Sequence, residues 1–302
     1  MKKLMIFSAA LAATALSLPA TVCAAPLPAA ESAAPTRFNV EVTGQGPDLI
    51  LIPGLSTSRG VWDATVADFK GQYRIHTVEV AGFGHDAGPN AEGEILPGLV
   101  DELAAYIEAN GLKSPTVVGH SMGGFTALNL SLDHPELVGK LVIVDSLPFF
   151  SVLFNPQATA ESAKGQASAM RSFLISQADT PVPEADCANP SPTAQGMSNT
   201  PEGQCRIDQL TLPADRRVAG QLLYELMTTD LRERVADLKV PTAMLYPYDE
   251  PAPSKAMADA VYGGAYGSAK AVTLVPIADS RHFIMLDQPE AFHAALADFL
   301  AR

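Results

Sequence analysis

The sequence has few of the residues from which cofactor and metal sites are built. It holds three cysteines and six histidines in 302 residues, and it contains no Gly-rich phosphate loop or dinucleotide-binding fingerprint. The stretch 148–238 holds two of the cysteines but no histidine, so it cannot complete a tetrahedral zinc site. We therefore expect neither a cofactor nor a metal.

Basic residues are scarce as well. The chain has 20 Lys and Arg against 33 Asp and Glu, a net charge of −13. So acidic a chain disfavours nucleic acid and anionic membranes as partners and favours a soluble protein. Within the stretches 36–147 and 239–302, no apolar run is long enough to suggest a transmembrane span.

The N-terminal residues are typical of a secretory signal peptide. Lys2 and Lys3 precede an apolar run that reaches about residue 20, and small residues follow near Ala24. We expect residues 1–24 to be removed, residues 25–35 to form a flexible leader, and the mature protein to be periplasmic or extracellular with no stable membrane anchor. Processing as a lipoprotein at Cys23 is disfavoured because Val22 is not a small residue.

Two cysteines remain after this cleavage, Cys187 and Cys205. An even pair in an exported protein usually forms a disulfide. In the chain-entropy model, closing a loop of this size stabilises the fold by about 3 kcal/mol. We predict that this disulfide holds the Pro- and Ser-rich stretch 180–201.

The most informative motif is the pentapeptide Gly119-His120-Ser121-Met122-Gly123, which directly follows the apolar run 116–118. Glycines on both sides of the serine allow a sharp strand-to-helix turn that pushes the serine Oγ out of the sheet. The helix that follows, expected over about 123–132, presents free N–H groups to an oxyanion. Ser121 is therefore the candidate nucleophile, and we expect His120 to pack the turn.

A serine hydroxyl is a poor nucleophile unless an imidazole removes its proton. His282 follows an apolar strand expected at 271–275 and precedes a helix expected near 290–300, which makes it the best candidate base. The sequence predicts solvated loop positions for four other histidines: His76, His85, His134 and His293.

A carboxylate is needed to orient His282 and to stabilise it once protonated. Between serine and histidine, the run 240–248 ends in two adjacent carboxylates, Asp249 and Glu250. Asp145 is a third candidate because it follows the apolar run 141–144, but we expect it to cap the entry into the next segment.

The order serine, acid, histidine resembles that of the α/β-hydrolase fold family, and the resemblance covers nearly the whole mature chain. Four further segments carry the resemblance. Residues 50–55 resemble that family's strand and oxyanion loop, and residues 80–84 resemble its next strand-end turn. Residues 141–145 resemble the strand before its lid, and residues 282–289 resemble its histidine loop. Pro53 stands where the family usually has histidine, and Pro247 stands where it usually has glycine, so the register of the acid stays open. Counting residues from the end of the strand places the family's acid at Glu250, whereas the resemblance of 246–249 to secreted members of the family favours Asp249 as the acid.

The resemblance implies an α/β fold with a mostly parallel, doubly wound sheet. Apolar runs alternate with helical stretches in 36–147 and 239–302, as such a core requires. The stretch 148–238 contains expected helices at 162–177 and 216–229 and resembles an inserted helical lid. The resemblance also implies that the backbone N–H groups of Leu55 and Met122 form the oxyanion hole.

We predict a serine hydrolase that cleaves small or medium apolar carboxylic esters through an acyl-enzyme. Apolar residues of the lid could line the pocket for this small-molecule substrate; they are Phe149, Phe150, Leu153, Phe154, Met170, Phe173, Leu174 and Met227. Three alternatives remain open: an amidase or peptidase on the same fold, a cofactor-free perhydrolase, and a non-catalytic ligand-binding protein.

Overall fold

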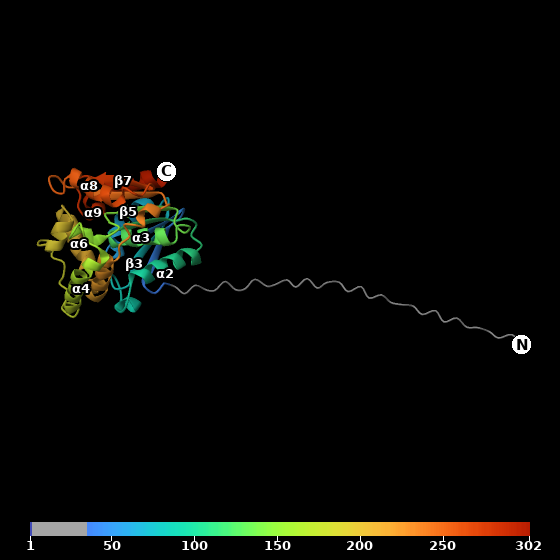
Figure 1. The fold of residues 1–302 in the computed structure, drawn as a ribbon, viewed down its shortest axis with the longest axis horizontal. Helices are drawn as coiled ribbons and strands as arrows, with labels where there is room; N and C mark the ends of the chain where they lie inside the picture. The colour runs from blue at the N-terminus through green and yellow to red at the C-terminus, as the bar shows by residue number, and fades with distance from the viewer. Residues whose placement is uncertain (2–34) are drawn as a thin grey trace. The chain divides into compact units, whose positions relative to one another are not determined.

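The computed structural model describes Met1 and residues 35–302 (Figure 1). Apart from Met1, the predicted signal peptide and all but the last residue of the predicted leader lie outside the described residues. In the part of the chain that the structure describes, no helix is long and apolar enough to cross a membrane.

The described residues form one seven-stranded sheet in the order β1-β3-β2-β4-β5-β6-β7. The strands are β1 (Phe38–Gly44), β2 (Asp48–Ile52), β3 (Arg74–Val80), β4 (Thr116–His120), β5 (Lys140–Val144), β6 (Thr242–Pro247) and β7 (Val272–Ile277). Strand β1 is antiparallel to β3, and all the other neighbouring pairs are parallel. The carboxyl ends of the parallel strands therefore share one edge, which is where ligands bind in such sheets.

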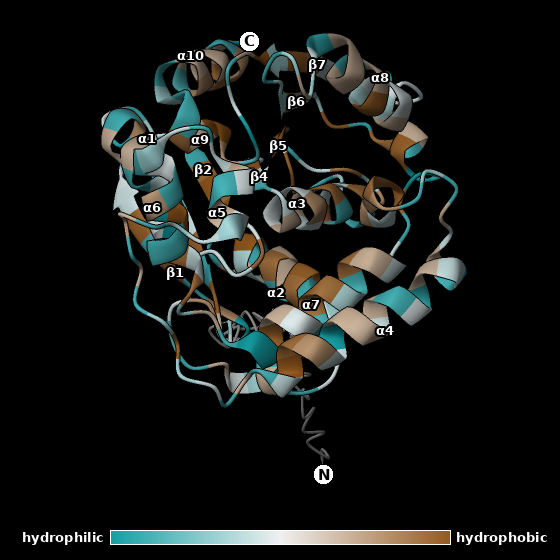
Figure 2. Cartoon of the chain, turned by 90° about the vertical axis from the view of Figure 1, so that its left-hand side faces the viewer, coloured by the Kyte–Doolittle hydropathy of each residue, from teal (hydrophilic) through white to brown (hydrophobic). Residues whose placement is uncertain are grey.

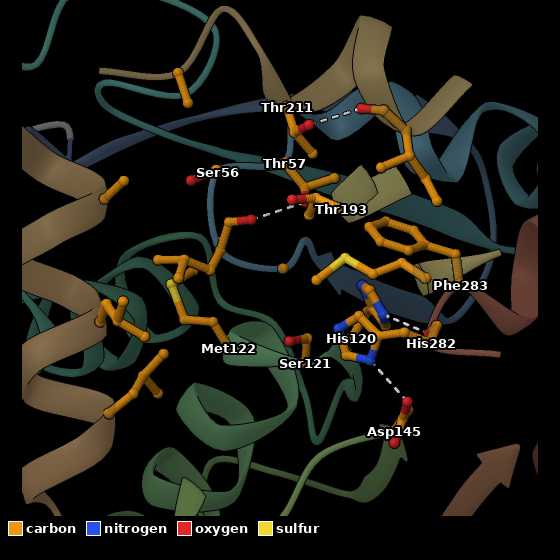
Figure 3. A pocket seen from close by; sticks show the side chains of 18 of the residues that line it. Ser56, Thr57, His120, Ser121, Met122, Asp145, Thr193, Thr211, His282 and Phe283 are labelled. Carbon is orange, nitrogen blue, oxygen red and sulfur yellow. Dashed lines mark hydrogen bonds and ion pairs between the residues drawn. The ribbon is translucent and has the colours of Figure 1, made fainter. Parts of the chain in front are cut away.

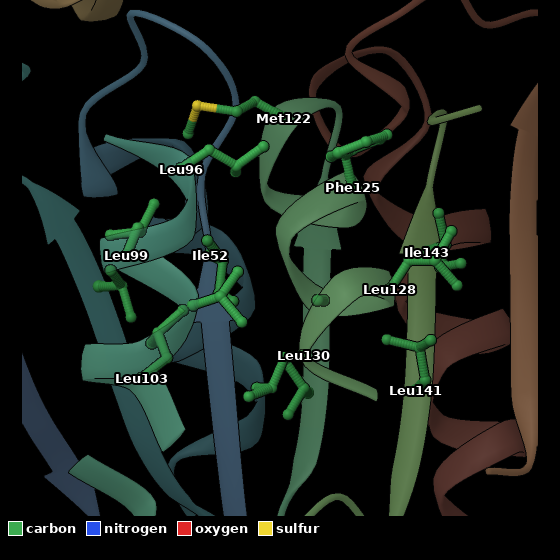
Figure 4. Packing of buried hydrophobic residues seen from close by; sticks show 14 of the residues in the cluster. Ile52, Leu96, Leu99, Leu103, Met122, Phe125, Leu128, Leu130, Leu141 and Ile143 are labelled. Atoms are coloured by element: carbon green, nitrogen blue, oxygen red, sulfur yellow. The ribbon is translucent and has the colours of Figure 1, made fainter. Parts of the chain in front are cut away.

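Helices cover both faces of the sheet because side chains alternate along each strand. Leu49 and Leu51 pack in a cluster with residues of α1 and α10, whereas Ile50 and Ile52 pack with residues of α2, α3 and α8. Figure 4 shows Ile52 among residues of α2 and α3. These helices are α1 (Asp63–Phe69), α2 (Leu96–Ala109), α3 (Met122–Asp133), α8 (Lys255–Tyr266) and α10 (Pro289–Ala301). Shorter helical segments are η1 (Arg59–Trp62), η2 (Gly88–Ala91), η3 (Phe150–Leu153), η4 (Val235–Asp237) and α9 (Ile284–Asp287).

Four helices are inserted between β5 and β6: α4 (Ala160–Ser176), α5 (Pro192–Met197), α6 (Pro201–Thr211) and α7 (Arg216–Thr228). Helices α4 and α7 run side by side (Figure 2) and share an apolar contact around Ala167, Leu223 and Met227. The predicted fold class, a mostly parallel α/β sheet with inserted helices, is confirmed. Helices α4 and α7 match the two expected helices, whereas α5 and α6 were not expected.

Helix α7 is tied to the sheet domain at both ends. At its start, the Asp215 N–H donates to the carbonyl of Gly82, at 2.7 Å. Near its end, the buried Glu225 carboxylate accepts from the N–H groups of Ile95 and Leu96, at 2.9 and 2.6 Å. These are the free N–H groups at the start of α2, where Ile95 supplies no side-chain cap. Helix α7 is therefore a fixed element rather than a loosely attached one.

Two histidines that the sequence predicted in solvated loops lie in regular elements instead. His76 is buried in β3, with Nδ1 at 2.8 Å from the Tyr106 hydroxyl and Nε2 at 3.0 Å from Asp48. Burial lowers the pKa of His76. His293 lies in α10, where its Nε2 is 3.2 Å from the Thr65 hydroxyl. Both expectations were wrong because the strand and helix patterns around these histidines place them on packed faces.

The predicted disulfide between Cys187 and Cys205 is present. It joins the loop that precedes α5 to the middle of α6. The Gln209 amide lies 3.4 Å from the Cys205 sulfur, one helical turn further along. The bond thus closes the loop over two short helices that have little apolar core of their own.

Removing this bond should lower stability. We expect the double variant Cys187→Ser, Cys205→Ser to unfold at a lower temperature, by an amount corresponding to up to about 3 kcal/mol, because its unfolded chain is less constrained. Thermal unfolding followed by circular dichroism measures the difference. Reductant should lower the Tm of the wild type and leave that of the double variant unchanged. Alkylation of both thiols in native, unreduced protein would contradict the pairing.

Candidate active site

Ser121 lies in a strained turn between β4 and α3. Its φ is 53° and its ψ is −118°, a conformation that non-glycine residues rarely adopt. A Cβ added to Gly119 would lie 2.1 Å from the carbonyl oxygen of Gly123, and one added to Gly123 would lie 2.3 Å from that of Ile52. Both flanking glycines are thus required by close backbone contacts, and the turn predicted from the pentapeptide is confirmed.

Two backbone N–H groups next to Ser121 are free to bind a ligand. Leu55 lies in the loop after β2, and Met122 is the first residue of α3. Neither N–H has an acceptor among the residues that the structure describes, and both residues line the same cavity as Ser121. The Ser121 N–H is used differently, since it donates to the Val144 carbonyl at 2.9 Å. Leu55 and Met122 can therefore supply the two donors of an oxyanion hole.

His282 follows β7, and its imidazole is bound by Asp145. The His282 Nδ1 lies 2.7 Å from Asp145 Oδ2. Asp145 directly follows β5, and its other carboxylate oxygen accepts a hydrogen bond from the Tyr262 hydroxyl of α8. Figure 3 shows the His282 ring beside Ser121, with the dashed line running from the ring to Asp145. This geometry fixes the tautomer with the proton on Nδ1 and leaves Nε2 free as a base.

The environment of Asp145 keeps it ionised. Burial alone would raise the pKa of this carboxyl, but the charge of His282 and the hydrogen bonds from His282 and Tyr262 outweigh burial, and the pKa lies below its ordinary value. Burial and the nearby Asp145 carboxylate raise the pKa of Tyr262. Tyr262 therefore stays protonated and remains a donor to the carboxylate.

The expectation that Asp249 or Glu250 faces His282 is corrected by the structure. Asp249 Oδ2 lies 3.0 Å from Arg281 Nε, and Glu250 accepts from the N–H of Lys255 at the start of α8, at 2.9 Å. Both carboxylates are thus bound elsewhere. Asp145, at the end of β5 beside the serine strand β4, contacts the imidazole in their place.

Asp145 was interpreted as a capping residue from the sequence, although its position directly after the apolar run 141–144 is a signal that could have raised its rank. Its φ is 44°, so the chain turns sharply at the strand end and the side chain is free to point along the sheet edge. A strand-end aspartate that directly follows the strand beside the one bearing the serine is well placed to reach a histidine at this edge. Asp249 also follows a strand of this edge, and only the side-chain contacts in the structure distinguish the two, because Asp145 binds His282 whereas Asp249 binds Arg281.

His120 connects the serine turn to the histidine loop. Its ring is buried, its Nε2 donates to the carbonyl of His282 at 2.9 Å, and the two rings lie 4.6 Å apart between centroids. Burial lowers the pKa of His120 to about 3, so it is neutral at ordinary pH. No carboxylate among the described residues orients this ring, and a pKa this low makes His120 a weak base for Ser121. His120 packs the turn, as the sequence suggested.

The site opens into a cavity of about 680 Å³. One part of its wall is apolar and includes Phe150, Leu174 and Leu223. Another part carries hydroxyl groups, and Figure 3 shows Thr57, Thr193 and Thr211 gathered on one side. Such a cavity has the size and mixed lining of a small-molecule site.

Only some of the apolar lid residues named from the sequence line this cavity. Phe150, Leu153 and Leu174 do. Phe149, Met170 and Met227 pack within the helices instead, and Phe154 and Phe173 are exposed. The choice between pocket and core depends on which side of each helix faces the serine, which hydropathy alone does not specify.

Comparison with known proteins agrees with this architecture. Residues 49–295 match the model of the alpha/beta hydrolase family. A pimeloyl-[acyl-carrier protein] methyl ester esterase of Vibrio atlanticus is 30% identical over 206 residues, which are 68% of this chain and 77% of the relative. The enzyme of the same name from Vibrio cholerae is 25% identical over 287 residues, covering 87% of this chain and 97% of the relative.

Solved structures show the same fold. A thermophilic esterase from Thermogutta terrifontis superimposes with a TM-score of 0.69 at 19% identity and covers 90% of this chain and 96% of its own. The enol-lactonase from Burkholderia xenovorans gives a TM-score of 0.68 at 17% identity, covering 88% and 97%. Since the family model spans most of the chain, and the serine turn and the histidine loop lie in one cavity, this protein belongs to the alpha/beta hydrolase family.

Proposed function

We propose that this protein is a serine esterase that cleaves small or medium carboxylic esters through an acyl-enzyme. One observation carries the proposal: a serine in a strained turn, an imidazole bound by a buried carboxylate, and two free N–H groups line a single cavity. Two relatives named as methyl ester esterases support an ester substrate. The apolar part of the wall supports an apolar acyl group.

In the first step, Ser121 Oγ attacks the ester carbonyl carbon while His282 Nε2 removes the hydroxyl proton. The N–H groups of Leu55 and Met122 hold the oxyanion of the tetrahedral intermediate. When the intermediate collapses, the carbon–oxygen bond to the alcohol breaks, and the alcohol leaves with the proton from His282. Asp145 holds the imidazole in the reactive tautomer and stabilises the imidazolium between these events.

In the second step, water replaces the alcohol. His282 Nε2 takes a proton from the water, whose oxygen attacks the acyl carbon, and the same two N–H groups hold the new oxyanion. Collapse returns the proton to Ser121 Oγ and releases the carboxylic acid. The free enzyme is restored with no other reactant.

We assign the acid to Asp145 and give Asp249 a different task. The Asp249–Arg281 ion pair holds the residue that directly precedes His282. The N–H of Arg281 also donates to Asp287 Oδ2, at 2.8 Å. Asp249 therefore helps to fix the histidine loop without touching the imidazole.

We also propose that the enzyme works outside the cytoplasm and that α4 to α7 form a lid over its site. The signal-like N-terminal pattern supports export, as does the Cys187–Cys205 disulfide, a bond that persists in oxidising compartments. The position of α4 to α7 between β5 and β6, next to the cavity, supports the lid.

The nucleophile can be tested directly. We expect Ser121→Ala to abolish labelling by a fluorophosphonate probe and to lower kcat/KM for p-nitrophenyl esters by about a thousandfold or more, because no other group can form the acyl-enzyme. Ser146→Ala is the matched control, since Ser146 also lines the cavity but lies beside the acid. Retained turnover in Ser121→Ala would rule out this mechanism, and turnover of amides but not esters would redirect it to an amidase.

The acid can be tested with isosteric variants. We expect Asp145→Asn to lower kcat by roughly a thousand- to ten-thousandfold with little change in KM, because the imidazole loses both its orientation and its counter-charge. Asp249→Asn and Glu250→Gln should stay within about tenfold of the wild type, since neither side chain contacts His282. Steady-state kinetics on one ester compares all three. A larger loss in Asp249→Asn than in Asp145→Asn would reverse the assignment.

A further inference from the structure

Arg216 is the cation of the catalytic cavity. Among the described residues that line this cavity, it is the only lysine or arginine. It is the first residue of α7, and it also lines a second, smaller cavity of about 240 Å³. Ala214 lines both cavities as well. Arg216 therefore lies where the two cavities meet.

Much of the Arg216 guanidinium is left without a partner. Its Nη1 donates to the carbonyl of Gln177 and to the hydroxyl of Thr180. In residues 35–302, neither Nε nor Nη2 has a hydrogen-bond acceptor, and no carboxylate lies within ion-pair distance. A guanidinium with free N–H groups and no counter-charge can bind an anionic ligand.

The neighbouring arginine differs in each of these respects. Arg217 pairs with Asp179 at 2.5 Å and lines neither cavity. Other arginines of the inserted segment also have carboxylate partners, as in the pairs Arg206–Asp63 and Arg234–Asp133, both at 2.7 Å. Arg217 therefore provides a matched control for Arg216.

The acids of the catalytic cavity are already engaged. Asp145 binds His282 and Tyr262. Asp208 accepts from the N–H and the hydroxyl of Ser191, at 2.7 and 2.6 Å. In the second cavity, Asp215 accepts from the N–H of Arg217 at 2.7 Å, and Asp86 is exposed. None of these carboxylates forms an ion pair with Arg216.

The wall of the catalytic cavity beside Arg216 suits an aliphatic substrate with one charged end. Leu174, Leu223 and Leu226 line the same cavity and offer apolar contacts for methylene groups. Resting on the proposed esterase function, we propose that Arg216 binds an anionic group at the far end of the substrate. The preferred substrates are then monoesters of dicarboxylic acids, with the ester carbonyl at Ser121 and the free carboxylate at Arg216.

The chemistry of arginine fits this task. Its planar guanidinium binds a carboxylate through two parallel hydrogen bonds, which gives both strength and orientation. The chain as a whole carries a net charge of −13 and repels anions. Selectivity for an anionic ester therefore has to come from a local cation in the cavity.

The test compares two series of substrates. One series contains the monomethyl esters of linear dicarboxylic acids of increasing length, and the other contains methyl esters of monocarboxylic acids with the same number of carbons. For the wild type, we expect kcat/KM to be higher for the carboxylate-ended ester at the length that spans from Ser121 to Arg216. This preference should fall as ionic strength rises.

Three variants separate recognition from structure. Arg216→Met should lower kcat/KM for carboxylate-ended esters by roughly ten- to a hundredfold and leave the neutral series within a factor of about two. Arg216→Lys should keep part of the preference, and Arg217→Met should keep all of it. An equal loss on both series in Arg216→Met would show that Arg216 only supports the end of α4, and would overturn the proposal.

If Arg216→Met does not fold, the wild type alone can still test whether Arg216 binds an anionic group. No preference for carboxylate-ended esters at any chain length would overturn the proposal for Arg216, while hydrolysis of the neutral series that depends on Ser121 would leave the esterase function intact. Failure to hydrolyse either series would instead count against the proposed function itself.

Discussion

The candidate site depends on the strained backbone of Ser121. A φ of 53° at a non-glycine residue costs of order 1–3 kcal/mol, and it persists only where the surroundings hold it. Here the Ser121 N–H is bonded to the end of β5, and the flanking glycines allow β4 and α3 to approach within contact of β2. The same turn exposes the serine hydroxyl and leaves the first N–H of α3 without an acceptor. The strained turn thus provides both the nucleophile, Ser121, and one oxyanion donor, the N–H of Met122.

The strand order supplies the rest of the site. Because β5 lies beside β4, the residue that follows β5 reaches the edge occupied by the serine turn. Asp145 uses this position to bind His282, and Tyr262 from α8 satisfies its second oxygen. Asp249 follows the next strand and is bound by Arg281. The two aspartates therefore support the same histidine loop, one at the imidazole and one at its flank.

The sequence predicts the features that depend on local patterns. The serine turn, the sheet and the disulfide follow from residues close together in the chain or from a simple count of cysteines. The acid does not, because Asp145 and Asp249 both follow apolar strands and only their contacts with residues distant in the sequence, His282 and Arg281, rank them. His76 was predicted in a solvated loop because a lone polar residue was given more weight than the strand pattern around it. Helix α5 was missed because it lies within the Pro- and Ser-rich stretch 180–201, which resembles a loop. Pro192 of α5, like Pro201 of α6, is nevertheless at a helix start, where proline is favoured.

Helix α7 links the sheet to the selectivity of the cavity. Its start is bonded to Gly82 and its end caps α2 through Glu225, so its position relative to Ser121 is set by the core of the sheet domain. A cation at the start of a helix held in this way lies at a fixed distance from the nucleophile. Rigid placement of a recognition group is what allows a site to distinguish substrates by length as well as by charge. The buried Glu225 carboxylate, which anchors α7, therefore helps to set the distance between Arg216 and Ser121.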